Sequence, residues 1–377
     1  MTRYGFISTY PPTRCGLATF TVSLANALAG PGDDPAVVVR LLEDDDDAAL
    51  APEDASRVVA VVRSNDPSSH RSAARALGGC DVVIVQHEYG IFGGEDGDHV
   101  IPLLEALEVP AIVVLHTVLS SPTAHQRHVL ERVAALASAI VVMTDHALRI
   151  LVTGYDVDPS RVSVIAHGAP VPSMLSVHHR GPVARVLTWG LLSPGKGIER
   201  GIRALSALQL RGIQAEYVVA GQTHPKVRTH SGETYRDELA GLSRALGVED
   251  SVRFVDRYLT DDDLAALLQS SDVVLLPYES HEQATSGVLV EAIAAGVPVV
   301  ATAFPHAVEL LTDGNGTVVA HDDVAGMVDA LETILTAAST RQAVAEPRMR
   351  GGASLSWAQV AAHYSALAGR LRTRQAA

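Results

Sequence analysis

Short runs of β-branched residues alternate with longer alanine- and leucine-rich stretches through almost the whole chain. Several short runs, such as VVIV and AIVVL, are apolar without interruption, which is typical of parallel strands covered on both faces. This alternation predicts an α/β fold built on doubly wound parallel sheets. In the first half, the expected strands are residues 4–8, 37–42, 58–62, 81–86, 111–116, 140–143 and 163–165.

The alternation breaks once, at residues 170–182, where PVPSMLSVHHRGP holds three prolines and no usable periodicity. We interpret this segment as a linker or hinge. At ~150 residues per domain, 377 residues suit about two domains. We predict a first domain at 1–169 and a second at 183–352. The strands expected in the second are 184–189, 216–220, 251–255, 273–277, 299–303 and 317–319.

The C-terminal segment, residues 353–377, has no strand after it and reads as one amphipathic helix. Its apolar stripe consists of Trp357, Val360, Ala361, Tyr364, Leu367, Ala368 and Leu371. Packing on the first domain across the domain junction would bury this stripe. Docking on a membrane surface is the alternative, and the few basic residues before Arg370 make it the less favoured one.

Composition excludes several classes of protein. The net charge of −14 argues against a nucleic-acid partner. Two cysteines are too few for a disulfide scaffold or a four-thiolate metal site, and the sixteen histidines show no metal-ligand spacing, so we expect no metal. The sequence has no run of ~18 apolar residues and no secretory signal, which predicts a soluble, cytoplasmic protein. Weak membrane association and the oligomeric state stay open.

Lys196 is the first residue that suggests a chemistry. It stands between Gly195 and Gly197 in a loop that follows the expected strand 184–189 and opens a helix. The chain has only one other lysine, Lys226, among 29 basic residues. A compact ammonium between glycines suits a phosphate oxygen, and a solvated loop is the alternative. The motif is neither a Walker loop nor a complete dinucleotide fingerprint, which disfavours a nicotinamide-dependent dehydrogenase.

Residues 273–302 carry the strongest signal. A polar loop follows the expected strand, and a helix begins near Thr285 or Ser286, both good N-caps. The helix amides near Ser286 and Gly287 could receive a diphosphate. Glu291, about one turn further along, could accept two hydrogen bonds from the vicinal hydroxyls of a ribose. A solvated helix face is the alternative, but the flanking residues are apolar.

Loops of the first domain complete the candidate site, because ligands of such sheets bind beyond the carboxyl ends of the strands. Gly16 lies at the turn into a helix, where a glycine lets an anion approach, although an ordinary turn is the favoured interpretation of this residue taken alone. His87, Glu88 and Tyr89 follow the strand at 81–86. His116 ends the strand at 111–116, and structural roles for both histidines are as plausible as site roles.

Taken together, these segments resemble the retaining, nucleotide-sugar-dependent glycosyltransferases of family 4, which have the GT-B fold. The most specific part is 271–302, SDVVLLP…TSGVLVEAIAAGVPVVAT, and WGLLSPGKG resembles the loop that grips the donor diphosphate. VIAHGAP at 164–170 resembles the end of the family's first domain. The resemblance covers nearly the whole chain and implies two Rossmann-like domains facing across a cleft, with the C-terminal helix returning to the first.

The resemblance also implies a role for each matching residue. Lys196 would contact the donor phosphates, Glu291 would bind the ribose, and His116 would lie at the donor sugar near the reacting carbon. The implied catalytic residues are His116, Lys196, Gln283 and Glu282. The implied donor-binding residues are Gly16, Gly190, Lys196, Gly221, Thr285, Ser286, Gly287 and Glu291, and those on the acceptor side are Arg14, His87, Glu88 and Tyr89.

The chain departs from the family pattern at two places. The family usually has an arginine where this chain has Leu191. Its paired glutamates are separated by seven residues, and counting back from Glu291 reaches Gln283, with Glu282 one place earlier. Either Gln283 contacts the sugar as an amide, or the loop shifts and Glu282 takes over. An amide cannot act as a nucleophile, which puts a double displacement through that position in doubt.

The expected reaction is therefore a metal-independent, cofactor-free transfer of a hexosyl group, mannosyl or glucosyl, with retention. The donor would be a UDP- or GDP-sugar and the acceptor an alcohol, such as a saccharide or glycoconjugate. A sugar-nucleotide 2-epimerase or a glycan phosphorylase of the same fold is an alternative. A non-enzymatic two-domain sugar-binding protein is another, and it would bind free sugar without nucleotide.

Overall fold

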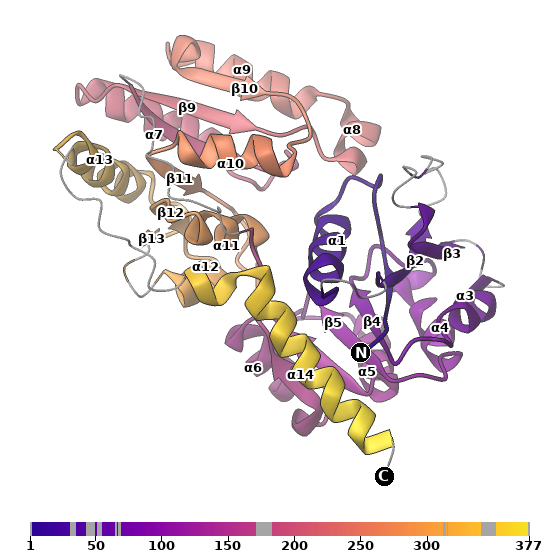
Figure 1. The fold of residues 1–377 in the computed structure, drawn as a ribbon. Helices are drawn as coiled ribbons and strands as arrows, with labels where there is room; N and C mark the ends of the chain where they lie inside the picture. The colour runs from indigo at the N-terminus through magenta and orange to yellow at the C-terminus, as the bar shows by residue number, and fades with distance from the viewer. Residues whose placement is uncertain are drawn as a thin grey trace. The chain divides into compact units, whose positions relative to one another are not determined.

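The computed structural model describes residues 2–30, 35–42, 50, 55–64, 66, 69–170, 183–311, 314, 316–340 and 352–375. Contacts divide the chain into two compact units, which are described separately: unit 1 is Met1–Gly168 with Leu355–Ala377, and unit 2 is Ala169–Ser354 (Figure 1). Most of the predicted linker, 171–182, lies outside the described residues.

Unit 1 is built on a seven-stranded parallel sheet in the order β3-β2-β1-β4-β5-β6-β7. Its strands are β1 (Tyr4–Ser8), β2 (Val37–Leu42), β3 (Val58–Arg63), β4 (Val82–His87), β5 (Ala111–Leu115), β6 (Ala139–Val142) and β7 (Val162–Val164). Its helices are α1 (Gly16–Leu28), α3 (His70–Ala76), η2 (Glu95–Gly97), α4 (Val100–Glu105), α5 (Ala124–Leu136), α6 (Asp145–Gly154), η3 (Pro159–Arg161) and α14 (Trp357–Gln375).

Unit 2 is built on a six-stranded parallel sheet in the order β10-β9-β8-β11-β12-β13. Its strands are β8 (Ala184–Trp189), β9 (Ala215–Ala220), β10 (Val252–Val255), β11 (Val273–Leu276), β12 (Val299–Thr302) and β13 (Gly316–Val319). Its helices are α7 (Ile198–Leu210), α8 (Pro225–Ser231), α9 (Thr234–Ala245), η4 (Glu249–Ser251), α10 (Asp261–Gln269), α11 (Gly287–Ala294), α12 (Pro305–Leu310), α13 (Val324–Thr340) and η5 (Gly352–Leu355), which reaches the boundary of unit 1.

Every strand predicted from the sequence forms, with each end within one residue of its predicted position. The central strands β1, β4, β5 and β6 are buried along their whole length, which explains their uninterrupted apolar runs. In each sheet the strand order reverses direction beside the first strand, between β1 and β4 in unit 1 and between β8 and β11 in unit 2. Ligands of doubly wound sheets bind at the carboxyl ends of such neighbouring strands.

The C-terminal helix α14, yellow in Figure 1, packs on unit 1. Its predicted apolar stripe packs against α1 and β1, with Trp357 half-buried and the other six residues buried. Tyr364 is fully enclosed, and Tyr4 donates a hydrogen bond to Ser365 at 3.2 Å. This confirms packing on the first domain and leaves the apolar stripe unavailable to a membrane surface. Among the described residues no helix combines the length and apolar character that crossing a membrane requires.

Candidate functional site

In unit 2 the loops that follow β8 and β9 approach each other closely at two glycines, one in each loop. Gly190 follows β8 with φ +120°, and Gly221 follows β9 with φ +134°. A Cβ atom on Gly221 would collide with the carbonyl oxygen of Gly190, so the close approach of the two backbones requires a glycine here. Both predicted donor-binding glycines therefore shape the carboxyl edge of the sheet by backbone geometry alone.

Lys196 is held at this edge by a loop pinned to the segment after β11. Gly197 has φ +64° and lies so close to the carbonyl of Pro277 that a Cβ atom would clash. The Glu279 amide donates to the carbonyl of Gly195 at 2.9 Å. The Lys196 ammonium lies 4.3 Å from the ring centroid of Tyr278, a cation–π contact.

Lys196 makes no ion pair with a carboxylate of any residue that the structure describes. Nearby Arg200, in contrast, contacts both Glu279, at 3.0 Å, and Asp322, at 3.1 Å. The aromatic ring stabilises the ammonium without a negative charge, so the cation stays available to an anionic ligand.

Glu291 is in the second turn of α11, and its carboxylate is only partly exposed. The indole N–H of Trp189, the last residue of β8, donates to Glu291 Oε2 at 3.3 Å. Burial raises the pKa of Glu291 from its ordinary 4.5 to about 7; the Trp189 hydrogen bond opposes this rise, and the charge of Asp261 adds to it. A solvated helix face does not describe this residue.

The N-terminus of α11 differs in part from expectation. Ser286 is the N-cap, and its hydroxyl accepts from the Leu289 amide at 3.3 Å. The Ser286 amide donates to Nδ1 of buried His306 at 2.8 Å, so it is already committed within the protein. Gly287, the first helical residue, has no hydrogen-bond partner for its amide among the described residues and remains the predicted contact for an anion.

The loop before α11 separates the two candidate sugar-contacting residues. Gln283 is partly buried, and its side-chain amide donates to the Thr285 carbonyl at 2.8 Å. Glu282 is exposed. The Gln283 side chain is thus held against the loop by its amide nitrogen, and its amide oxygen is left to accept a hydrogen bond from a ligand. The Glu282 side chain lies at the surface.

In unit 1, His116 follows β5 and pairs with a neighbour on β4. Its Nε2 lies 2.7 Å from Oε1 of Gln86, which is fully buried. With this amide orientation Nε2 is the donor and Nδ1 is an acceptor. Burial lowers the pKa of His116 to about 3, with smaller effects of the same sign from His167 and His87. The ring is therefore neutral, and it packs edge-on against Phe20 at 5.0 Å.

The predicted acceptor-side residues separate into interior and surface. His87 is fully buried, with neither ring nitrogen hydrogen-bonded, and burial lowers its pKa to about 4. Glu88 accepts from Thr117 at 2.6 Å and from the Tyr89 amide at 3.0 Å. The His87 ring packs against Tyr89, whose ring centroid is 5.3 Å away, and its predicted place on the acceptor side stays a prediction.

Arg14 and Gly16, in contrast, are exposed at the start of α1. Cys15 is the N-cap of this helix but makes no side-chain capping hydrogen bond, and a Cβ atom on Gly16 would meet nothing within 4 Å. The first turn of α1 therefore remains open, as an anion-binding role would need, although sterically Gly16 could be replaced by alanine.

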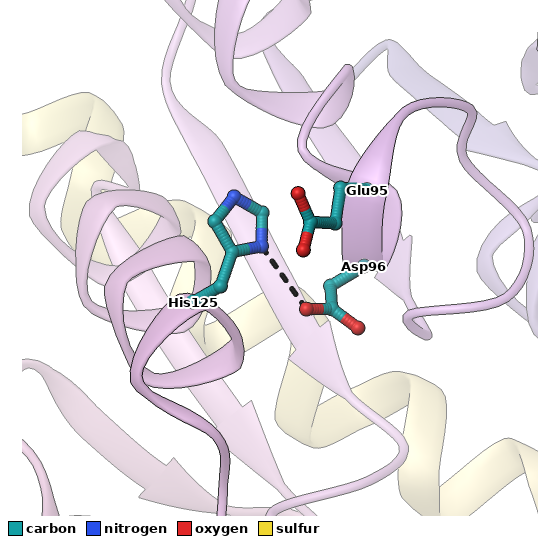
Figure 2. Close-up of side chains that lie close together, drawn as sticks. All are labelled: Glu95, Asp96 and His125. Atoms are coloured by element: carbon teal, nitrogen blue, oxygen red, sulfur yellow. Dashed lines mark hydrogen bonds and ion pairs between the residues drawn. The ribbon is translucent and has the colours of Figure 1, made fainter.

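One group of potential metal ligands escaped the sequence analysis. Glu95 and Asp96 of η2 and His125 of α5 point toward one another, with ligand atoms within 4.8 Å (Figure 2). The sequence separates the acids from the histidine, so no short ligand spacing marks them. His125 Nδ1 lies 3.0 Å from Asp96, which raises the pKa of His125, and Gln126 donates to Asp96 at 3.2 Å. These hydrogen bonds join η2 to α5, so no metal ion is needed to explain why the three side chains lie close together.

Sequence reasoning also missed three residues that hold predicted site residues in place: Trp189, Tyr278 and Gln86. Each lies at or just beyond the carboxyl end of a strand, on β8, after β11 and on β4. A large or polar side chain ending an apolar run was the available signal. No sequence signal indicated the partner of each side chain: Trp189 and Glu291, for example, are 102 residues apart.

Two family models match the chain: Glycosyltransferase Family 4 over residues 15–171 and Glycosyl transferases group 1 over residues 178–347. A D-inositol 3-phosphate glycosyltransferase of Corynebacterium efficiens is 30% identical over 61% of this chain and 56% of its own length. The chain thus spans just over half of that relative. One of Corynebacterium diphtheriae is 26% identical over 92% of this chain and 87% of its own.

Among solved structures, a glycosyltransferase from Rickettsia africae superposes with a TM-score of 0.72 at 14% identity, over 98% of both chains, which shows a shared fold. The two family models together leave only short segments uncovered, and they match the two sheets found in the structure. The chain belongs to the family 4 (group 1) glycosyltransferases and has their GT-B fold.

Proposed function

We propose that the protein transfers a hexosyl group from a UDP- or GDP-sugar to an alcohol acceptor, with retention of configuration and without a metal. One observation carries the proposal: Lys196 is fixed at the carboxyl edge of the unit 2 sheet without a carboxylate partner among the described residues. A cation held in this way is suited to the phosphates of a nucleotide-sugar.

The donor would contact several groups of unit 2. Lys196 and the Gly287 amide would contact the diphosphate, and Glu291 would accept hydrogen bonds from the ribose hydroxyls. Gly190 and Gly221 would let the backbone approach the ligand closely, since neither carries a side chain that could block it. Gln283 would contact the donor sugar through its amide oxygen, because its nitrogen is held by Thr285.

In this proposal unit 1 supplies His116 and the exposed start of α1. A neutral His116 with an acceptor at Nδ1 would receive a hydrogen bond from a sugar hydroxyl near the reacting carbon. Arg14 and Gly16 would lie on the acceptor or diphosphate side. Tyr89 and Glu88 would form the acceptor wall, with His87 supporting the wall from the interior.

The chemistry asks mainly for stabilisation of a leaving nucleoside diphosphate. Preorganised donors at the developing charge are the largest single contribution in many enzymes, and loss of one donor typically costs about 10²–10³ in rate. Lys196 and the α11 amide would supply them. The leaving phosphate oxygen would accept the proton of the attacking alcohol, so no protein base is required. Gln283 cannot form a covalent sugar ester, which makes a double displacement through this position untenable.

The relatives named D-inositol 3-phosphate glycosyltransferases suggest a phosphorylated polyol among the acceptors to be tested. UDP- and GDP-sugars would first be screened by calorimetry, and the tightest donor would then be incubated with alcohols, saccharides and D-inositol 3-phosphate. We expect nucleoside diphosphate release that depends on an acceptor and persists in EDTA. Turnover that instead requires inorganic phosphate would identify a phosphorylase, and binding of free sugar without nucleotide would refute the proposal.

A further inference from the structure

Trp189 connects a strand end of unit 2 to the predicted ribose-binding carboxylate. The side chain is almost fully buried, with 5% of its surface exposed, and its one hydrogen-bond donor is directed at Glu291 Oε2, 3.3 Å away. Trp189 ends β8, while Glu291 belongs to α11. The next residue, Gly190, turns the chain with φ +120°, so the rigid strand fixes the indole just before the backbone leaves the sheet.

This hydrogen bond makes the two carboxylate oxygens inequivalent. Oε2 accepts the indole hydrogen bond, whereas Oε1 has no hydrogen-bond partner among the described residues. Oε1 is also not one of the described polar atoms that are both buried and unpartnered, so solvent or a ligand can reach it. The charged group that influences the carboxylate is Asp261 of α10, which repels it, and no described cation forms an ion pair with it. The indole is therefore the only described group that both orients the carboxylate and favours its charged form.

We propose that Trp189 is a positioning residue of the donor site: its indole N–H holds one oxygen of the Glu291 carboxylate and leaves the other directed at the ribose hydroxyls. The ribose part of this assignment rests on the proposed function. The Trp189–Glu291 pair itself does not, and it can be tested without nucleotide.

The first experiment uses the fluorescence of the free protein. The chain has two tryptophans, so Trp357→Phe leaves Trp189 as the sole indole. We expect its emission to titrate with a midpoint near pH 7, because protonation of Glu291 removes the negative acceptor beside it. Adding Glu291→Gln should abolish that transition, and adding the exposed-site change Glu238→Gln should not. A transition that survives Glu291→Gln, or no transition at all, would overturn the pairing.

The second experiment measures binding of UDP and GDP by calorimetry from pH 6 to 9. Trp189→Phe removes the group that favours the charged carboxylate, so the midpoint of binding should move to higher pH. Affinity should fall roughly tenfold at pH 7 and largely recover at pH 9. Glu291→Gln serves as the reference, since it reports only the titration of the nucleotide and of other groups.

A uniform loss of affinity at every pH would assign Trp189 a merely structural role and overturn the proposal. Lack of UDP and GDP binding by the unaltered protein would refute the proposed function instead. In that case the fluorescence titration would still decide whether Trp189 positions Glu291.

Discussion

Replacing Glu291 by glutamine should stabilise unit 2 at alkaline pH while weakening the proposed donor binding. The carboxyl group has its pKa raised from 4.5 to about 7, chiefly by burial. Since one pKa unit corresponds to about 1.4 kcal/mol, the folded state disfavours the ionised carboxylate by about 3 kcal/mol. Glutamine keeps the shape and can still accept the Trp189 hydrogen bond, but it carries no charge.

The sign follows from the order in which the two states lose the proton. Below pH 4.5 the carboxyl is protonated in both states and costs nothing. Between pH 4.5 and 7 the unfolded chain ionises first, so the folded protein loses stability as the pH rises. Above pH 7 the full cost is present. Relative to Glu291→Gln, the unaltered protein should therefore lose about 2.5 kcal/mol between pH 5 and 8.5, because a small part of the cost is already present at pH 5.

Urea unfolding followed by Trp189 emission, in a Trp357→Phe background, would report on unit 2 alone. Taking the difference between the two proteins at each pH cancels the titration of the histidines they share. Glu238→Gln, at an exposed position of α9, is the matched control and should give a difference independent of pH. Parallel stability curves for the Glu291→Gln variant and the unaltered protein would refute the buried, partly protonated carboxyl.

The remaining predictions concern turnover. Lys196→Ala should lower the transfer rate about 10²–10³-fold with an unchanged far-UV circular dichroism spectrum. Arg203→Ala, on the exposed side of α7, is the control and should leave the transfer rate unchanged. Equal transfer rates for the Lys196→Ala variant and the unaltered protein would remove Lys196 from the phosphate site. Gln283→Ala should reduce transfer far more than Glu282→Ala, because only Gln283 is held in the loop wall; equal, mild losses in steady-state assays would mean that neither contacts the sugar. EDTA dialysis should leave transfer intact, and a metal-restorable loss would direct attention to the His125 cluster.

The fold was predictable because each domain-level feature has a local signal. Fully buried strands require continuous apolar residues, and those runs place the ends of β1, β4, β8 and β11 to within one residue. Capping chemistry is equally local: Thr260 and Asp263, three residues apart, form a capping box at the start of α10. The apolar residues of α14 likewise recur at helical spacing, so the sequence alone shows which face of the helix is buried.

The candidate site was predictable only as far as its residues share a segment. Lys196 stands out within its loop and Glu291 within its helix, but the ring under the lysine and the indole on the glutamate come from other strands. The commitment of the Ser286 amide to His306 depends on α12, twenty residues further along. The burial of His87 likewise arises from Phe92 and Tyr89 packing over a strand end, which no pattern within 81–89 reveals.

Lys196 and Glu291 are both held in place by a neutral aromatic side chain rather than by an ion pair. A carboxylate beside Lys196, or a cation beside Glu291, would hold the side chain in place but would have to be displaced by the ligand. Breaking a buried ion pair costs about 3–5 kcal/mol, whereas a cation–π contact is worth about 0.5–2 kcal/mol and leaves the ammonium hydrogens free. The indole of Trp189 similarly occupies only one carboxylate oxygen. Neutral aromatic partners therefore keep both charges positioned and still available, which an ion pair between them and the protein would not allow.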